Sequence, residues 1–303
     1  MSPAKKKSST QAKSKLPQQV SGWFSGVIGT LILCIMLAGI FIACAYAAWQ
    51  KIGSRVLASP EYFVGPEQFE ITQPPPWLHR SDLRVELYND LSRRGPIRIM
   101  DEDLIERVHA ALLQQPWVAK ILRVQKQYPA KIKVELVYRR PVCMVEISGE
   151  LIPVDVEGTL LPNLDFSPVE KAKYPRLIGV DRGPMRGVGA RWGDSRVAGG
   201  AEIANELLPL WEKLNLQSIV PHLPPEAASA GASPPRAPRR LGDYYFSITT
   251  RGGMRIFWGR SPASNSLGES TPEQKIKKLK QFFDEHGSLD YPQGPRELDL
   301  RQP

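Results

Sequence analysis

The residue types that perform most protein chemistry are sparse and scattered in this sequence. Its histidines are far apart and lack the spacing of metal ligands: His79, His109, His222 and His286. No GxSxG nucleophile motif, P-loop or HExxH zinc motif occurs. We therefore predict no catalytic, cofactor-binding or metal-binding residue, and we expect that the protein is not an enzyme. An enzyme with an unfamiliar type of site stays open as an alternative.

Three local features could suggest reactivity or binding, but each has a simpler interpretation. The carboxylates of residues 101–103 (Asp-Glu-Asp) begin a predicted helix, where negative charge offsets the positive end of the helix dipole. Cys143 has no His or Lys nearby to activate its thiol, so we expect a half-buried strand residue. Trp192 lies in a predicted loop and could bind a ligand, but we expect it to fold onto its own domain.

The elements that would position any site begin with a long apolar segment. Residues 20–49 include no charged residue between Gly26 and Ala48. About 20 apolar residues in a helix cross a hydrocarbon core of roughly 30 Å, so we predict a transmembrane helix over 20–49. Aromatic residues, which favour membrane interfaces, flank both ends: Trp23, Phe24, Tyr46 and Trp49. A cleaved signal peptide and lipoprotein processing at Cys44 are alternatives that the length of the segment disfavours.

The charge pattern predicts the orientation of this helix. Residues 1–19 contain five lysines and no acidic residue, and positive charge beside a first span is retained in the cytoplasm. We therefore predict a cytoplasmic tail at 1–19 and an ectodomain from about residue 50 onward, in a single-pass type II protein of the cell membrane. Since this tail carries five of the nine net positive charges, the basic composition does not indicate nucleic-acid binding.

The rest of the chain predicts an α+β fold in two parts. After a juxtamembrane linker at 50–68, residues 69–142 show the order strand, helix, helix, strand, strand. Residues 143–303 predict a mixed α+β domain with an antiparallel sheet and a disordered Pro/Ala-rich insert at 221–240.

Within the second part, glycine and proline dominate the local predictions. The Gly- and Arg-rich segment 181–200 is predicted to be a loop, followed by an amphipathic helix over 201–216 with a kink at Pro209. A final helix opens with the capping sequence Thr-Pro-Glu-Gln at 271–274. The chain closes on a predicted short strand at 297–301.

Short motifs follow the apolar segment in a fixed order. They are Pro116-Trp117-Val118, Val124 to Pro129, Arg140-Pro141-Val142, Val154 to Gly158, Pro175 to Gly179 and Leu298 to Arg301. With the basic tail and the single span, this order resembles the FtsQ/DivIB bacterial cell-division proteins. The resemblance implies that 69–142 is a POTRA domain and that 143–303 is the β-domain of that family. It also implies a non-enzymatic scaffold of the divisome, located in the inner membrane at the division septum and needed for septum formation.

The resemblance further implies where partners bind. FtsB/FtsL-like partners would add a strand to an open sheet edge at the C-terminus, with the candidate residues Leu298, Asp299, Leu300 and Arg301 and the neighbouring Phe257 and Trp258. Other division proteins would contact Lys126, Gln127 and Tyr128 in the POTRA hairpin. For Phe257, Trp258, Leu298 and Leu300, ordinary core packing stays open as the alternative. A POTRA-containing component of envelope transport or secretion is the alternative function.

Overall fold

The computed structural model describes residues 19–57, 59–78, 82–223, 241–264, 268–290 and 294–302. Residues 1–18 of the predicted tail and 224–240 of the predicted insert therefore lie outside the described residues. The chain divides into two compact units, with the boundary between Tyr62 and Phe63.

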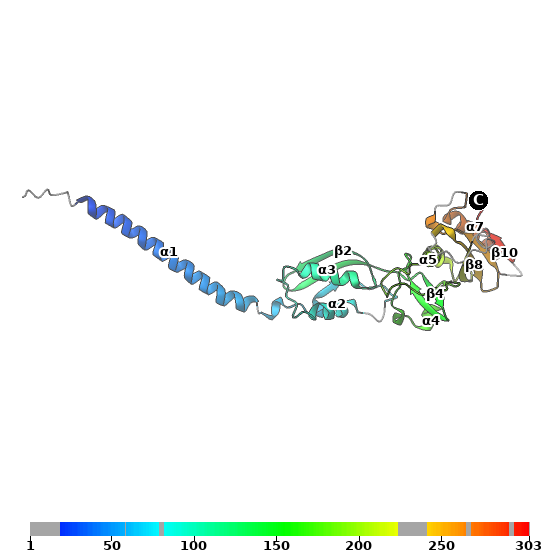
Figure 1. The fold of residues 1–303 in the computed structure, drawn as a ribbon, viewed down its shortest axis with the longest axis horizontal. Coiled ribbons are helices and arrows are strands. Elements are labelled where there is room, and N and C mark those ends of the chain that lie inside the picture. Colours follow the sequence, from blue (N-terminus) through cyan, green and yellow to red (C-terminus); the bar gives the residue numbers. More distant parts are fainter. Residues whose placement is uncertain are drawn as a thin grey trace, which may run out of the picture. The chain divides into compact units, whose positions relative to one another are not determined.

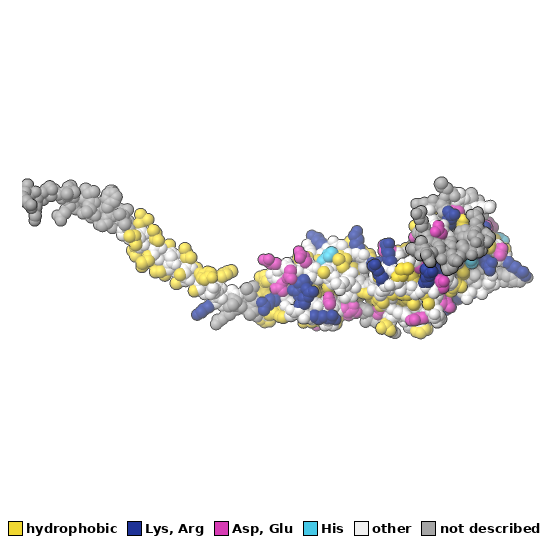
Figure 2. All heavy atoms as spheres, in the orientation of Figure 1, with side chains coloured by type: hydrophobic (Ala, Val, Ile, Leu, Met, Phe, Trp, Pro, Cys, Tyr) yellow, Lys and Arg dark blue, Asp and Glu magenta, His cyan; other side chains and the backbone are white. Residues whose placement is uncertain are grey.

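The first unit consists mainly of one long helix, α1 (Gln19–Leu57), drawn in blue in Figure 1. Its segment Gly29–Gly53 is long and apolar enough to cross a membrane, by length and composition. Apolar side chains cover the described surface of this segment (Figure 2). The helix continues beyond Trp49 to Leu57, so part of the predicted linker is helical. The first proline after the span is Pro60, which begins a short 3-10 turn, and the sequence before it can stay helical.

The second unit starts with a three-stranded sheet and two helices. Its elements are β1 (Phe69–Ile71), α2 (Leu83–Ser92), α3 (Leu104–Gln114), β2 (Val118–Gln127) and β3 (Lys131–Tyr138). The strand order is β1-β3-β2, with β1 parallel and β2 antiparallel to β3. Each helix buries leucine and other apolar residues at a spacing of three or four, so the two helices pack against each other and the sheet (Figure 1).

A larger mixed sheet follows in the same unit. Its strands are β4 (Cys143–Ile147), β5 (Glu150–Val154), β6 (Arg176–Leu177), β7 (Leu216–His222), β8 (Tyr245–Thr250), β9 (Arg255–Gly259) and β10 (Glu297–Asp299). The helices are α4 (Pro168–Lys171), α5 (Ser195–Leu207) and α7 (Pro272–His286). The strand order is β10-β9-β8-β7-β6-β4-β5.

The predicted antiparallel sheet is wrong, because three of the six pairings are parallel. These pairings are β10 with β9, β7 with β6 and β6 with β4. Parallel neighbours require a crossover connection that returns the chain to the same end of the sheet. The helices α4, α5 and α7 lie in those connections. The broader prediction of an α+β fold is confirmed.

The predicted loop at 181–200 is also wrong at its C-terminal end, where α5 begins at Ser195. Two glycines of this helix are buried against the sheet. A Cβ atom on Gly199 would lie 2.7 Å from Phe246 Cζ, and one on Gly200 would lie 2.6 Å from Leu177 Cδ1. These glycines therefore allow a helix to approach the sheet closely and do not mark a loop. The helix ends at Leu207, and a 3-10 turn containing Pro209 follows it.

Smaller differences concern burial and strand length. Cys143 is fully buried, not half-buried as predicted. β7 extends to His222, so the first two residues of the predicted insert belong to a strand. Trp192 folds onto its own domain as predicted, and its indole nitrogen donates a hydrogen bond to the Arg182 carbonyl oxygen at 3.0 Å. The capping box at Thr271 and Gln274 is confirmed at the start of α7.

Side chains from residues 69–142 and 143–303 meet within the second unit. A buried apolar cluster combines residues from both parts: Leu78, Trp117, Met144, Leu161 and Phe166. The Trp117 indole nitrogen donates a hydrogen bond to Asp165 at 2.8 Å. Arg139 forms an ion pair with the nearly buried Asp155 at 2.6 Å. The predicted domain boundary at 142 therefore falls inside one compact unit.

Candidate partner-binding site

The C-terminal strand β10 lies at one edge of the seven-stranded sheet. The Arg296 carbonyl oxygen accepts a hydrogen bond from the Arg255 amide at 2.9 Å, and the Leu300 amide donates one to the Phe257 carbonyl oxygen at 3.0 Å. The backbone groups of successive strand residues point to opposite sides of the strand. The amide and carbonyl groups of Glu297 and Asp299 therefore point away from β9, toward the open edge.

Burial separates the predicted partner-binding residues of this region into two groups. Trp258 and Leu300 are 0% exposed and belong to the main hydrophobic core. The core alternative therefore holds for both side chains, and the predicted partner contact at these two positions stays a prediction. Leu298 is half-buried and packs against the same core, and Phe257 is also half-buried. Leu298 alternates with the exposed Glu297 and Asp299, which is the normal pattern of a strand with one buried face. Phe257 instead lies between the fully buried Ile256 and Trp258 and faces the other side of the sheet.

The exposed side of β10 carries a pair of opposite charges. Arg301 lies 2.6 Å from the Asp299 carboxylate, and its amide donates a second hydrogen bond to the same carboxylate at 2.9 Å. The hydrogen bond from Arg301 lowers the pKa of Asp299, and the same contact raises the pKa of Arg301. The Arg301 guanidinium also lies 5.6 Å above the Phe257 ring. Such exposed pairs add little to stability, but they give the edge a defined charge pattern.

The opposite edge of this sheet is blocked at the C-terminal end of β5. Pro153 in β5 has no amide hydrogen to offer, and its carbonyl oxygen accepts a hydrogen bond from the Leu161 amide at 3.0 Å. Val154 is also bridged to Leu160. Proline and local coverage are common means of blocking an edge strand. Of the two edges of this sheet, β10 is therefore the one that can accept an added strand.

The hairpin residues predicted to contact other proteins lie in the other sheet. Tyr128 is 81% exposed at the tip of the β2–β3 hairpin, and Gln127 is exposed beside it. Lys126 is half-buried, and its ammonium group donates a hydrogen bond to the Asp101 carbonyl oxygen. The two predicted contact regions therefore belong to different sheets and form two separate surfaces.

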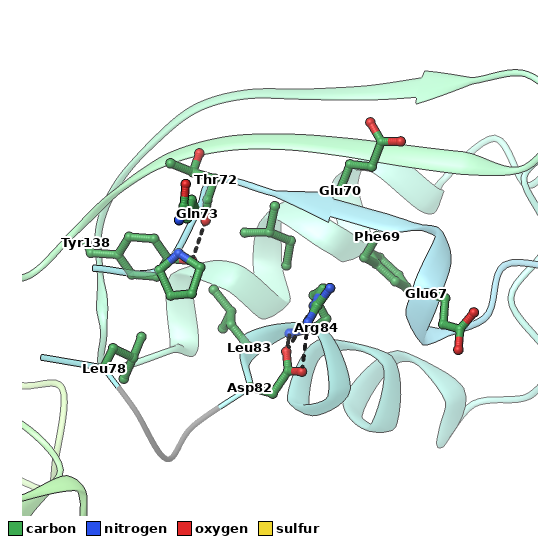
Figure 3. A pocket seen from close by; sticks show the side chains of 12 residues that line it. Glu67, Phe69, Glu70, Thr72, Gln73, Leu78, Asp82, Leu83, Arg84 and Tyr138 are labelled. Atoms are coloured by element: carbon green, nitrogen blue, oxygen red, sulfur yellow. Dashed lines mark hydrogen bonds and ion pairs between the residues drawn. The ribbon is translucent and has the colours of Figure 1, made fainter. Parts of the chain in front are cut away.

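A hollow of about 560 Å³ between β1 and the start of α2 is absent from the sequence predictions (Figure 3). Three of its four charged lining residues are in ion pairs, since Asp82 contacts Arg84 at 3.2 Å and Glu70 contacts Lys131 at 2.7 Å. Tyr138 donates a hydrogen bond to the Thr72 carbonyl oxygen at 2.8 Å, and burial raises the pKa of this tyrosine. No sequence motif marks this hollow, because it depends on the distance between a strand and a helix.

Across the described ranges, no group of three or more His, Cys, Asp or Glu side chains could hold a metal ion. No family model matches this chain, and a search of curated proteins finds no match.

Proposed function

We propose that this protein is a non-enzymatic scaffold of the bacterial divisome, of the FtsQ/DivIB type, with a POTRA-like domain at 69–142. It would link cytoplasmic and periplasmic division proteins and bind FtsB/FtsL-like partners by strand addition. One observation carries this proposal: the seven-stranded sheet ends in β10, whose outward backbone groups at Glu297 and Asp299 are available to a partner strand.

The membrane anchor and the charge pattern support the location. Segment Gly29–Gly53 of α1 has the length and composition of a membrane span, and the lysines of residues 1–19 favour a cytoplasmic N-terminus. In this arrangement the second unit lies in the periplasm at the division septum. A protein anchored in this way needs no catalytic group, because its role is to hold partners together.

In the proposed mode of binding, the backbone supplies affinity and side chains supply selectivity. A partner strand beside β10 would form hydrogen bonds with the outward amide and carbonyl groups of Glu297 and Asp299. The exposed charges of Glu297, Asp299 and Arg301 would then favour a partner with complementary charges. The hairpin tip at Gln127 and Tyr128, with Lys126 beside it, is the proposed contact for other division proteins.

A pair of substitutions at Glu297 tests strand addition directly. Glu297→Pro removes an outward amide hydrogen without removing any donor to β9, whereas Glu297→Ala removes the same side chain and keeps the amide. Losing one backbone hydrogen bond at an interface costs about 1–3 kcal/mol, or roughly a five- to hundredfold increase in Kd. We expect this loss for Glu297→Pro and little change for Glu297→Ala, measured by biolayer interferometry of the full chain against the FtsB- and FtsL-like proteins of the same organism.

Two results would contradict the proposal. Equal weakening by both substitutions would mean that the glutamate side chain, and not the outward amide, carries the interaction. The division role itself would be contradicted by two results together. The wild-type protein would bind neither partner, and its fluorescent fusion would be spread evenly over the membrane instead of gathering at the septum.

A further inference from the structure

A second, smaller pocket lies where the start of α7 meets the end of β9. Its volume is about 220 Å³, and the residues that line it include Trp258, Arg260, Ser270, Thr271 and Lys275. Thr271 caps α7, a helix of 15 residues, through its hydroxyl and the Gln274 amide. The first turn of a helix presents positive partial charge and amide donors.

Residues that line the pocket include some whose buried polar atoms have no hydrogen-bond partner among the described residues. Two of these atoms are the indole nitrogen of Trp258 and the hydroxyl oxygen of Ser270. The two residues are 0% and 5% exposed, respectively. Buried polar groups are nearly always paired, since an unmade hydrogen bond in the interior is costly. An indole N–H can only donate, so the group missing from this pocket is a hydrogen-bond acceptor.

The charge of the lining favours an acceptor that is an anion. Lys275 has a side chain only 4% exposed, and its ammonium group lies 3.0 Å from Glu269 and 5.2 Å from the Trp258 ring. Arg260 is a second cation of the lining, so the pocket holds two cations and one carboxylate, a net charge of +1.

The single carboxylate of the pocket is already engaged. Glu269 Oε2 accepts hydrogen bonds from the Lys275 ammonium and from the Arg260 amide, each at 3.0 Å. Gly259 precedes this amide in the chain. A Cβ atom on Gly259 would lie 2.3 Å from Glu269 Oε2, and the φ angle of Gly259 is +94°. Glycine therefore leaves room for Glu269 at this position, and this carboxylate does not hydrogen-bond the unpartnered donors.

We propose that this pocket binds a small oxyanion of the phosphate class. The Trp258 indole N–H, the Ser270 hydroxyl and the Lys275 ammonium donate hydrogen bonds to its oxygens, and the N-terminus of α7 adds favourable partial charge. At about 30 Å³ for each water of liquid, the pocket has room for roughly seven waters, so a phosphate group fits. The phosphate is either the free ion or a phosphate monoester, since both present the same oxygens.

The test uses the full chain in detergent micelles, with inorganic phosphate as the probe and sodium chloride added to keep the ionic strength constant. We expect a saturable rise in Tm, because a ligand of the folded state stabilises it. We also expect one tryptophan indole N–H resonance to shift on titration, and this resonance disappears in Trp258→Phe. A wild-type protein without a saturable response in either measurement overturns the proposal.

Two conservative variants separate binding from stability. Trp258→Phe and Ser270→Ala each remove a donor that has no partner in the free protein. Ser270→Ala therefore leaves Tm without phosphate nearly unchanged, whereas Trp258→Phe also shortens a fully buried core side chain and lowers it. Each raises the Kd for phosphate by about tenfold or more, the value of one hydrogen bond to a charged group. Trp192→Phe is the matched control, because it removes a paired indole donor. It lowers Tm and leaves the response to phosphate unchanged.

A second arm identifies the source of the phosphate. Glycerol 3-phosphate replaces inorganic phosphate at the same ionic strength. Tighter binding of the ester supports an esterified phosphate as the ligand, and equal or weaker binding supports the free ion. If both ligands bind Trp258→Phe and Ser270→Ala as tightly as the wild type, these donors do not hold the anion and the proposal fails.

Discussion

Replacing Gly200 by alanine tests how closely α5 packs on the seven-stranded sheet. The added methyl group would lie 2.6 Å from Leu177 Cδ1 and 2.9 Å from Cδ2. Leu177 is 0% exposed, so its side chain has no open space into which it could rotate. Alanine improves helix propensity by about 1 kcal/mol, whereas overpacking a core costs about 1–3 kcal/mol. We therefore expect a net destabilisation of about 1 kcal/mol.

This loss corresponds to a decrease in Tm of about 2–4 °C for a unit of this size. The measurement is thermal unfolding of the full chain, followed by tryptophan fluorescence. A double-mutant cycle with Leu177→Ala provides the control. The leucine truncation alone costs about 2–5 kcal/mol because it leaves a cavity, but the cavity accommodates the new methyl group. Relief of the overpacking cost should therefore make the double variant more stable than the sum of the single effects by about 2 kcal/mol.

A rise in Tm for Gly200→Ala alone, as helix propensity by itself would require, would show that the methyl group does not clash with Leu177. An additive cycle would likewise show that the methyl group and Leu177 do not compete for the same space.

Two further predictions concern the buried groups of the second unit. Arg139→Met leaves the Asp155 carboxylate, which is 5% exposed, without its cation. This loss should lower the free energy of unfolding, measured by urea titration, by about 3–5 kcal/mol. An unchanged urea midpoint would contradict a stabilising role of the ion pair. Burial raises the pKa of the Cys143 thiol. In a variant with Cys34→Ser and Cys44→Ser, a thiol reagent at pH 8 should therefore react with Cys143 only after denaturant is added. Rapid labelling of the native protein would contradict the buried placement.

Local patterns predict the elements whose signals lie within a few residues. Leucines four residues apart predict α2, whose buried face is formed by Leu83, Leu87 and Leu91. The capping residues at Thr271 and Gln274 predict the start of α7. These signals succeed because a helix satisfies its hydrogen bonds within itself, so neighbours in the sequence are also neighbours in space.

Long-range packing explains the predictions that fail. Gly199 and Gly200 have low helix propensity, and only the sheet beneath them gives a reason for their presence in α5. Strand pairing is equally non-local. β10 pairs in parallel with β9, a strand about 40 residues away, and a short β-prone segment carries no sequence signal for such a partner. The alternation in β9 likewise cannot reveal that Trp258 faces the core.

The candidate sites are predictable only in part. The sequence predicts a short strand at 297–301, but which of its backbone groups point outward depends on its pairing with β9. The capping sequence at 271–274 predicts the helix start beside the α7 pocket, but no motif predicts the pocket itself, because it also needs Trp258 from β9. Tryptophan and serine do not by themselves indicate an anion site. Only the structure shows that the donors of Trp258 and Ser270 have no acceptor.

The unequal edges of the seven-stranded sheet set a limit on stoichiometry. A sheet that is open at both edges can add strands repeatedly and grow into a fibre. Here Pro153 and its contact with Leu161 block continuous pairing at β5, so growth is possible in one direction only. Two copies joined through β10 would end at two blocked β5 edges and stop as a dimer. An excess of this protein in the membrane should therefore not polymerise through this sheet.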